Sequence, residues 1–221
     1  MKIDAVILAK SSMWGKFCVA GIDIHSGMWV RFIGYGDGEP LDDSQMLFIN
    51  DGGSCEPLDI ARIRIARELP HHNHTEDYMI ERDMWLRLGR MTIQDVLRVH
   101  PEEEYRFIFG NDREYVSEYE MNQLQHRYSL ILIRAENLRL FTKKNYDGEL
   151  KARAEFVHHG RVYSRIRVTD PDYEPKTEGS LEIGEAYLVM SMPVKPFYVE
   201  GGGRYYKLVA KIFPLQNEGG K

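Results

Sequence analysis

The sequence predicts a mainly β protein with a small helical connector, and three features of the chain support this class. Short runs in which apolar and polar residues alternate recur in the first and last thirds of the 221 residues. Clusters of glycine, proline and aspartate separate these runs, as turns between strands require. Patterns with helical spacing occur mostly between the two thirds. We therefore expect two β domains joined by a partly helical segment.

The first β third, residues 1–68, contains the following candidate strands: Ile3–Leu8, Phe17–Asp23, Met28–Ile33, Met46–Asn50 and Leu58–Arg67. Between the second and third of these, His25-Ser26-Gly27 has the composition of a three-residue hairpin loop ending in a left-handed glycine. This loop places Ile22 opposite Val30 and Ala20 opposite Phe32, and it directs Cys18 into the core. Cys55 lies in a loop rich in glycine and aspartate, so we expect no disulfide.

The middle segment, residues 69–127, predicts two helices. The first spans Thr92–Val99 and ends before Pro101. The second spans Ser117–Arg127, where Ser117 and Glu120 have the spacing of a capping box. We treat this segment as a polar connector.

The last β third, residues 128–215, is followed by a polar tail, 216–221, that we expect to be frayed. Its candidate strands are Ser129–Ala135, Leu150–Val157, Arg161–Thr169, Ala186–Met192 and Tyr205–Phe213. About five short strands before residue 69 and five after residue 128 predict two tandem OB-like five-stranded barrels. A single sheet running through both halves would contradict this.

Charge and composition limit the possible functions. The net charge is −5, divided into −3 for residues 1–68, −5 for the connector and +3 for residues 128–221. Proteins that coat nucleic acid non-specifically are usually basic, so an anionic partner must bind a local patch. The chain has neither an export signal nor an apolar run that could span a membrane, and it has only two cysteines. We expect a cytoplasmic protein.

Several segments in order resemble one known family. In the first half these are ILAKSSMWGKFCVAGIDIHSGMWVRFI (7–33), EPLDIARIRI (56–65) and HTEDYMI (74–80). In the second half they are YSLILIRAENLRL (128–140), VTDP (168–171), IGEAYLVMSMPVKPF (183–197) and YYKLVAKIF (205–213). The chain resembles the dual OB-containing domain family over nearly its whole length. The resemblance implies a prokaryotic protein with two OB-like barrels, an association with defence systems, and binding of nucleic acid or nucleotides, with no catalytic residues to carry over.

In the first barrel, the candidate nucleic-acid-binding residues lie in a predicted loop and on one strand. The loop Lys10–Lys16 contains Lys10, Ser11, Trp14 and Lys16, which offer cations, a hydroxyl for phosphate and a ring for stacking. Alternatively, Trp14 folds back as a lid on the core. Trp29 and Arg31 share a strand face beside Gly21, which leaves space for a flat ligand; alternatively, Trp29 covers the barrel under the connector helices.

In the second barrel, the strands around His158-His159-Gly160 carry a basic stripe. A three-residue loop places Arg153 opposite Arg165 and Lys151 opposite Arg167, with Arg161 and Tyr163 on the same outward face. Like charges directly opposite each other destabilise a sheet, and a bound anion would relieve the repulsion. Alternatively, carboxylates of the connector balance the stripe.

Catalytic, metal and cofactor sites have little support in the sequence. His71, His72 and His74 precede Glu76 and Asp77, but no known metal-ligand spacing matches, and an exposed polar loop explains them. Asp170 follows a strand in Thr-Asp-Pro, which favours a cap over a catalytic acid. We assign no catalytic residue, metal or cofactor.

The leading functional hypothesis is non-catalytic binding of nucleic acid or a nucleotide. Two alternatives remain open. One is an enzyme that processes nucleotides or nucleic acid at a site between the barrels. The other is a protein-interaction module that uses the acidic connector. OB folds host many functions, so the fold alone does not choose among them.

Overall fold

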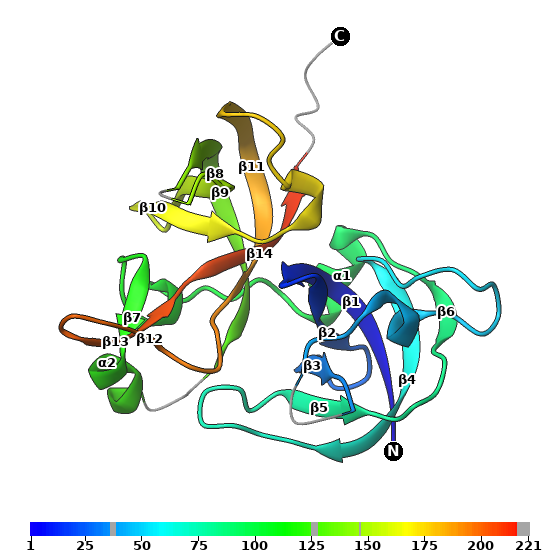
Figure 1. Ribbon diagram of the computed structural model, residues 1–221. Helices are drawn as coiled ribbons and strands as arrows, with labels where there is room; N and C mark the ends of the chain where they lie inside the picture. Colours follow the sequence, from blue (N-terminus) through cyan, green and yellow to red (C-terminus); the bar gives the residue numbers. More distant parts are fainter. Residues whose placement is uncertain (36–38, 125–127, 146, 216–221) are drawn as a thin grey trace, which may run out of the picture. The chain divides into compact units, whose positions relative to one another are not determined.

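The computed structural model describes residues 1–35, 39–124, 128–145 and 147–215 (Figure 1). The chain divides into two compact units, Met1–Pro101 and Glu102–Lys221. Each unit has its own sheet that closes into a ring, so no continuous sheet joins them among the described residues.

The first unit consists of a ring of five strands with one strand added at the edge. The strands are β1 (Lys2–Met13), β2 (Lys16–Asp23), β3 (Trp29–Ile33), β4 (Asp59–Glu68), β5 (Asp77–Ile80) and β6 (Leu86–Arg90). Their order is β1-β2-β3-β5-β4, with β4 pairing back onto β1 and β6 lying outside β4. The 3-10 turn η1 (Asp43–Met46) and helix α1 (Ile93–Val99) complete the unit.

The second unit is a closed barrel with a small extra sheet. The barrel strands are β8 (Leu130–Lys144), β9 (Leu150–His158), β10 (Arg161–Val168), β11 (Gly179–Ser191) and β14 (Leu208–Pro214). The extra sheet has the order β12 (Phe197–Val199), β13 (Gly202–Tyr206), β7 (Tyr115–Ser117). The unit also contains helix α2 (Glu118–Gln123) and the 3-10 turns η2 (Ile108–Gly110) and η3 (Pro171–Tyr173).

Both rings have the same connectivity. Counted along each unit, the barrel strands lie in the order 1-2-3-5-4, and strand 4 pairs with strand 1. Strands 3 and 5 are parallel in both: β3 with β5, and β10 with β14. This is the Greek-key arrangement of the OB fold, so the predicted mainly β class with two OB-like barrels is confirmed.

Separate apolar cores fill the two barrels. Ile7, Phe32, Ile63 and Trp85 belong to the core of the first unit. Leu138, Phe156, Tyr163 and Leu188 belong to that of the second. In strands such as β9, buried residues alternate with exposed ones, so each sheet has one inward and one outward face.

The structure divides the predicted connector between the two units. Its first part supplies β5, β6 and α1 to the first unit, and its second part supplies η2, β7 and α2 to the second. The short strand β5 escaped the sequence analysis because it follows a polar, His-rich segment. Both predicted helix starts are correct, since Thr92 and Ser117 cap α1 and α2 through capping boxes. The predicted end of the second helix (125–127) and the tail lie outside the described residues.

The register predicted for the first hairpin is wrong by one residue. Ile22 lies opposite Trp29 rather than Val30, because the loop is one residue longer: the Asp23 amide donates to the Met28 carbonyl, and the Ile24 amide donates to Asp4 of β1. A one-residue shift exchanges the two faces of a strand, so Cys18 lies outside the apolar core. Cys55 is the cysteine inside it. Both thiols are free, as predicted.

The same shift gives Gly21 a structural role. A Cβ atom at this position would lie 2.2 Å from the carbonyl oxygen of Val6 on the neighbouring strand β1. Backbone cannot move aside as a flexible side chain can, so the close approach of β1 and β2 requires glycine here.

We therefore expect Gly21→Ala to destabilise the protein by about 1–3 kcal/mol, the usual cost of overpacking. Chemical denaturation followed by tryptophan fluorescence would measure the change. Gly179→Ala is the matched control, because it also lies in a strand but nothing lies within 4 Å of its added Cβ. Equal stability of the two variants would contradict the prediction.

Candidate nucleic-acid interface

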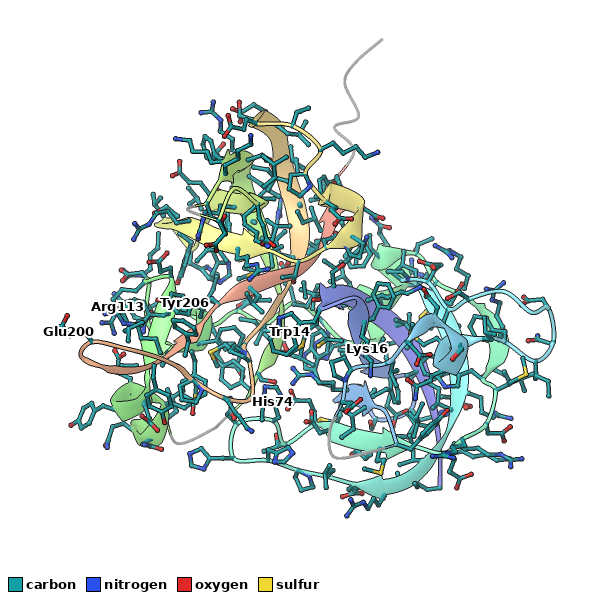
Figure 2. The ribbon with its side chains drawn as sticks, viewed as in Figure 1. Trp14, Lys16, His74, Arg113, Glu200 and Tyr206 are labelled. Carbon is teal, nitrogen blue, oxygen red and sulfur yellow. The ribbon has the colours of Figure 1, made fainter. Side chains whose placement is uncertain are left out.

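In the first barrel, the predicted binding loop is much shorter than the sequence suggested. Strand β1 continues to Met13, and Trp14-Gly15 alone form the turn into β2, with φ angles of 49° and 76°. Positive φ at both positions is typical of a type I′ hairpin turn. Figure 2 shows Trp14 at this turn, and this residue is 91% exposed. This exposure rules out the alternative that Trp14 is a lid on the core.

The cations near this turn are already paired with carboxylates. Lys10 lies in β1 rather than in a loop and is buried, and its Nζ is 3.1 Å from both Asp43 Oδ1 and Glu56 Oε1. Lys16 Nζ lies 2.7 Å from Glu39 Oε2. Ser11 is buried in the same strand as Lys10. Of the predicted loop, Trp14 is therefore the side chain best placed to contact a ligand.

Arg31 lies in a buried cluster of charged side chains. Its guanidinium is 3.3 Å from Glu76 Oε1 and 3.6 Å from Asp77 Oδ1, and it contacts the ring of His74. Burial and the neighbouring Arg31 lower the pKa of His74, although Asp77 opposes this. The cluster joins β3 to the start of β5. The His-rich segment is thus not simply an exposed polar loop, because His74 packs inside the unit.

Trp29 and Gly21 do not form the predicted space for a flat ligand. Gly21 lies opposite Val30, on the other face of the sheet from Arg31, and Val6 fills the space beside it. The ring of Trp29 packs edge-on against His100 at 5.3 Å, directly after α1. Trp29 is thus half-buried against the residue that ends α1, whereas the alternative placed it under the connector helices.

In the second barrel, the register predicted for the basic hairpin is also wrong. The turn has two residues, His159 and Gly160, both with positive φ, so Phe156 lies opposite Tyr163. Tyr163 is consequently buried, stacked on Phe156 at 5.5 Å, and its hydroxyl accepts a hydrogen bond from the Ile108 amide. Tyr163 therefore does not accompany the cations on the outward face.

A bulge then restores the outward position of the remaining cations. Between Tyr163 and Ile166 the register shifts, with Arg165 at φ 61°. Without the bulge, strict alternation would direct Arg165 into the core, where an unpaired guanidinium is very costly. Instead, Arg165 lies 3.0 Å from Glu114, and Arg161 lies 3.6 Å from Asp112. Carboxylates of the predicted connector thus balance these two arginines.

The other cations share an exposed surface with like charges opposite each other. Arg153 faces Arg167 of β10 on one side and Phe141 of β8 on the other. One pair further along, Lys151 faces Lys143. We call this surface the basic face and define it by Phe141, Lys143, Lys151, Arg153 and Arg167.

Little opposing charge reaches the basic face. Lys151 Nζ is 2.6 Å from Glu149, while Arg153 donates to the carbonyl of Arg165 at 3.0 Å. Among the described residues, no carboxylate forms an ion pair with Lys143, Arg153 or Arg167. Arg139 packs over the ring of Phe141 at 4.6 Å and pairs with Glu182. The face therefore combines Lys143, Arg153 and Arg167, which pair with no carboxylate of the described residues, with one paired lysine and one half-buried aromatic ring.

Phe141 and Lys143 were not among the predicted binding residues, although the sequence carries a signal for them. The predicted strand stopped at Ala135, whereas β8 continues to Lys144. The alternation Leu138, Leu140, Thr142 against Arg139, Phe141, Lys143 extends the strand pattern through this stretch. Two polar residues in its middle, Glu136 and Asn137, concealed it, and Asn137 adopts a φ of 52° where the strand is irregular.

The buried Lys207 holds in place the segment 111–114, whose carboxylates pair with Arg161 and Arg165. Lys207 Nζ donates to the backbone oxygen of Asn111 at 2.6 Å and to its Oδ1 at 2.9 Å, below the ring of Tyr163. Burial lowers the pKa of this amine to about 7, against the attraction of Asp112. The contact holds residues 111–114 beside β10.

The Asp170 carboxylate, considered above as a catalytic acid, has a structural role. The Asp170 carboxylate caps η3 and accepts hydrogen bonds from the amides of Asp172 and Ile212, with Lys211 Nζ at 3.1 Å. The described residues contain no group of three or more His, Cys, Asp or Glu side chains that could hold a metal ion. Neither helix in the described parts of the chain is long and apolar enough to cross a membrane.

Comparison with known proteins agrees with this architecture. A family model described as the dual OB-containing domain matches residues 3–212, nearly the whole chain. The chain belongs to the dual OB-containing domain family. No curated protein and no solved structure matches it. Membership of this family accounts for the repeated strand order, and the family's OB folds are of a type that commonly binds nucleic acid.

The exposure of Trp14 leads to a paired prediction. Trp14→Ala is expected to change the free energy of unfolding by less than about 0.5 kcal/mol, since exposed side chains contribute little to stability. Trp85→Ala, in the core at 1% exposure, is the contrasting control and should cost about 3–5 kcal/mol. If the turn stacks on a base, Trp14→Ala also weakens single-strand binding by about 1–3 kcal/mol. Destabilisation by Trp14→Ala would contradict its assignment as a free turn residue.

Lys207 predicts a pH dependence of stability. The unfolded amine, with its ordinary pKa of 10.5, stays protonated between pH 7 and 10, whereas the folded amine loses its proton near pH 7. The unfolded state then binds more protons, so stability rises with pH by up to about 1.4 kcal/mol per unit in this window. Denaturant titrations at pH 7, 8 and 9 should show this rise in the wild type, and Lys207→Met should remove it. Lys143→Met, an exposed control, should keep the rise; identical slopes for all three proteins would contradict the prediction.

Proposed function

We propose that this protein binds single-stranded nucleic acid, without catalysis, through the basic face of its second barrel. The observation that carries the proposal is the placement of like charges directly opposite each other, Arg153 with Arg167 and Lys151 with Lys143. Directly opposed like charges each destabilise a sheet by a few tenths of a kcal/mol to about 1 kcal/mol. A row of bound phosphates would convert this repulsion into attraction.

The position of the basic face on the barrel supports the proposal. It covers the first three strands of the OB arrangement, β8, β9 and β10. In OB folds the face formed by the second and third strands, with the loop between the first and second, is the usual oligonucleotide surface. In this unit that loop joins Lys144 to Leu150.

The residue types on the face also suit this ligand. Arginine and lysine neutralise phosphates, and an aromatic ring stacks on a base irrespective of its identity. Phe141 lies between Arg139 and Arg153, so a base on its exposed edge would have a cation on either side. Glu149 and Glu155 are the acidic side chains closest in the strand register, and Glu149 already pairs with Lys151. The face remains net positive.

The test is a double variant, Arg153→Ala with Arg167→Ala, measured by fluorescence anisotropy with a labelled single strand of about 15 nucleotides, the upper range for one OB fold. We expect binding to weaken about tenfold or more at low salt. The slope of log K against log salt should fall by about 1.4, since each lost phosphate contact removes about 0.7 for single strands. Stability should be unchanged or slightly higher, because the repulsion is gone.

A matched control distinguishes the effect of where the two arginines lie from the effect of lowering the net charge. Arg64→Ala with Arg98→Ala removes two exposed arginines of the first unit, which pair with Asp83 and Asp95. It changes the net charge by the same amount and should leave affinity and salt slope near the wild-type values. Equal affinity of wild type and the Arg153/Arg167 variant would remove the basic face from the binding site.

A further inference from the structure

The small sheet of the second unit has an exposed aromatic face that the basic face does not explain. In its register Phe197 of β12 lies opposite Arg204 of β13, and Tyr206 of β13 lies opposite Tyr115 of β7. Since Arg204 and Tyr206 are two residues apart, these four side chains share one face. Tyr205 and Val116 occupy the other face and pack in the core. We call the outward-facing set of exposed Phe197 and half-buried Arg204, Tyr206 and Tyr115 the aromatic platform.

The rings of the platform are neighbours that lie at angles of 58° and 62° to one another. The centroids of Tyr115 and Tyr206 are 5.8 Å apart, and those of Phe197 and Tyr206 are 6.4 Å apart. The guanidinium of Arg204 covers the ring of Tyr115 at 4.4 Å. Phe197 is 64% exposed, although burying such a ring normally contributes to stability. An exposed phenylalanine ring beside two half-buried tyrosines and a stacked guanidinium indicates a surface that binds flat groups.

The platform adjoins the strand that carries the basic face. Arg161 and Arg165 of β10 reach Asp112 and Glu114, which immediately precede the platform strand β7. Lys207, which follows the platform strand β13, anchors Asn111 in the same segment. Figure 2 shows Arg113 and Tyr206 together at this sheet. A chain lying across β10 can therefore continue onto the platform.

We propose that the aromatic platform stacks the unpaired bases of the same single strand whose phosphates bind the basic face. This inference rests on the proposed function and deepens it, because it assigns a second surface that holds the unpaired bases of the strand. Bases stack on aromatic rings and on guanidinium planes irrespective of sequence, so the site selects unpaired strands rather than a particular sequence.

The charges around the platform agree with base stacking rather than phosphate binding. Arg113 also lies over Tyr115 but pairs with Glu120, and Glu200 lies in the turn between β12 and β13. Glu118 accepts a hydrogen bond from Tyr198, which lies opposite Gly203 and hence on the other face from Phe197. The rim is thus not basic, so phosphate affinity belongs to the basic face, and the platform contributes contacts to uncharged rings.

The experiment compares Phe197→Ala with Tyr198→Ala, two neighbouring aromatic residues of similar exposure on opposite faces of one hairpin. Each variant is titrated with a single strand of mixed sequence and with the same strand made abasic at consecutive positions in one half. Phe197→Trp is the conservative variant. Thermal denaturation confirms that each variant is folded, as the exposure of both side chains leads us to expect.

We expect Phe197→Ala to weaken binding of the intact strand by about tenfold, the usual range for one lost stacking contact. Binding of the abasic strand should change by less than about twofold, because it has no bases to stack. Tyr198→Ala and Phe197→Trp should bind the intact strand like the wild type. A duplex of the same sequence should bind more weakly than the single strand and should not respond to Phe197→Ala.

Several results would overturn the proposal. Wild-type affinity of Phe197→Ala for the intact strand would show that the platform is not part of the site, and a protein partner would then be its occupant. An equal loss for intact and abasic strands would show a contact other than stacking. Failure of the proposed function would give a different result. The double variant Arg153→Ala with Arg167→Ala would then bind like the wild type, while Phe197→Ala would still bind the intact strand more weakly. A wild type that binds no strand would remove both proposals.

Discussion

Each barrel closes where its third strand meets its fifth strand in parallel, and this short contact keeps one face of each sheet enclosed. In the second barrel the contact comprises only two residue pairs, Arg167 with Leu208 and Val168 with Val209. Asp170 extends it, because its carboxylate binds the Ile212 amide and Lys211 of β14. In the first barrel, Arg31 of β3 pairs with Asp77 at the start of β5 and with Glu76 before it.

Buried contacts between acidic and basic groups therefore stabilise the closure of both barrels. These contacts also explain why two sequence segments contain buried carboxylates. The carboxylates of HTED and VTDP have the residue types of catalytic or metal sites, yet in the structure they join strands 3 and 5. Burial raises the pKa of Asp170, so desolvation outweighs its favourable partners. Removing one partner from such a contact leaves a buried charge unsatisfied, which costs more than the contact itself contributes. Their role is to keep the ring closed so that one face of each sheet remains outside.

The sequence predicted the class of fold well because alternation survives errors of register. It failed at the hairpins, where a difference of one loop residue exchanges the faces of a strand. The two-residue turn His159-Gly160 directed Tyr163 inward, and the bulge at Arg165 then returned Arg167 to the outward face opposite Arg153. No local sequence pattern predicts this bulge, so the residues that face each other across the hairpin could be assigned only from the structure. Arg153 nevertheless faces a cation in either register, so the repulsion between like charges is common to both.

Ion pairs with carboxylates that are distant in the sequence divide the candidate cations into paired and unpaired ones, which composition alone cannot do. Lys10, Lys16 and Arg31 of the first barrel all contact carboxylates, as do Arg161 and Arg165 of the second. The basic face retains cations that no described carboxylate pairs with, on a chain whose net charge is −5. In the proposed complex, a net negative surface repels the polyanion while the basic face attracts it, so charge acts mainly on the orientation of the encounter. On this proposal, the affinity that remains after salt screening comes from contacts that salt does not weaken, and the exposed ring of Phe197 is a group able to supply one.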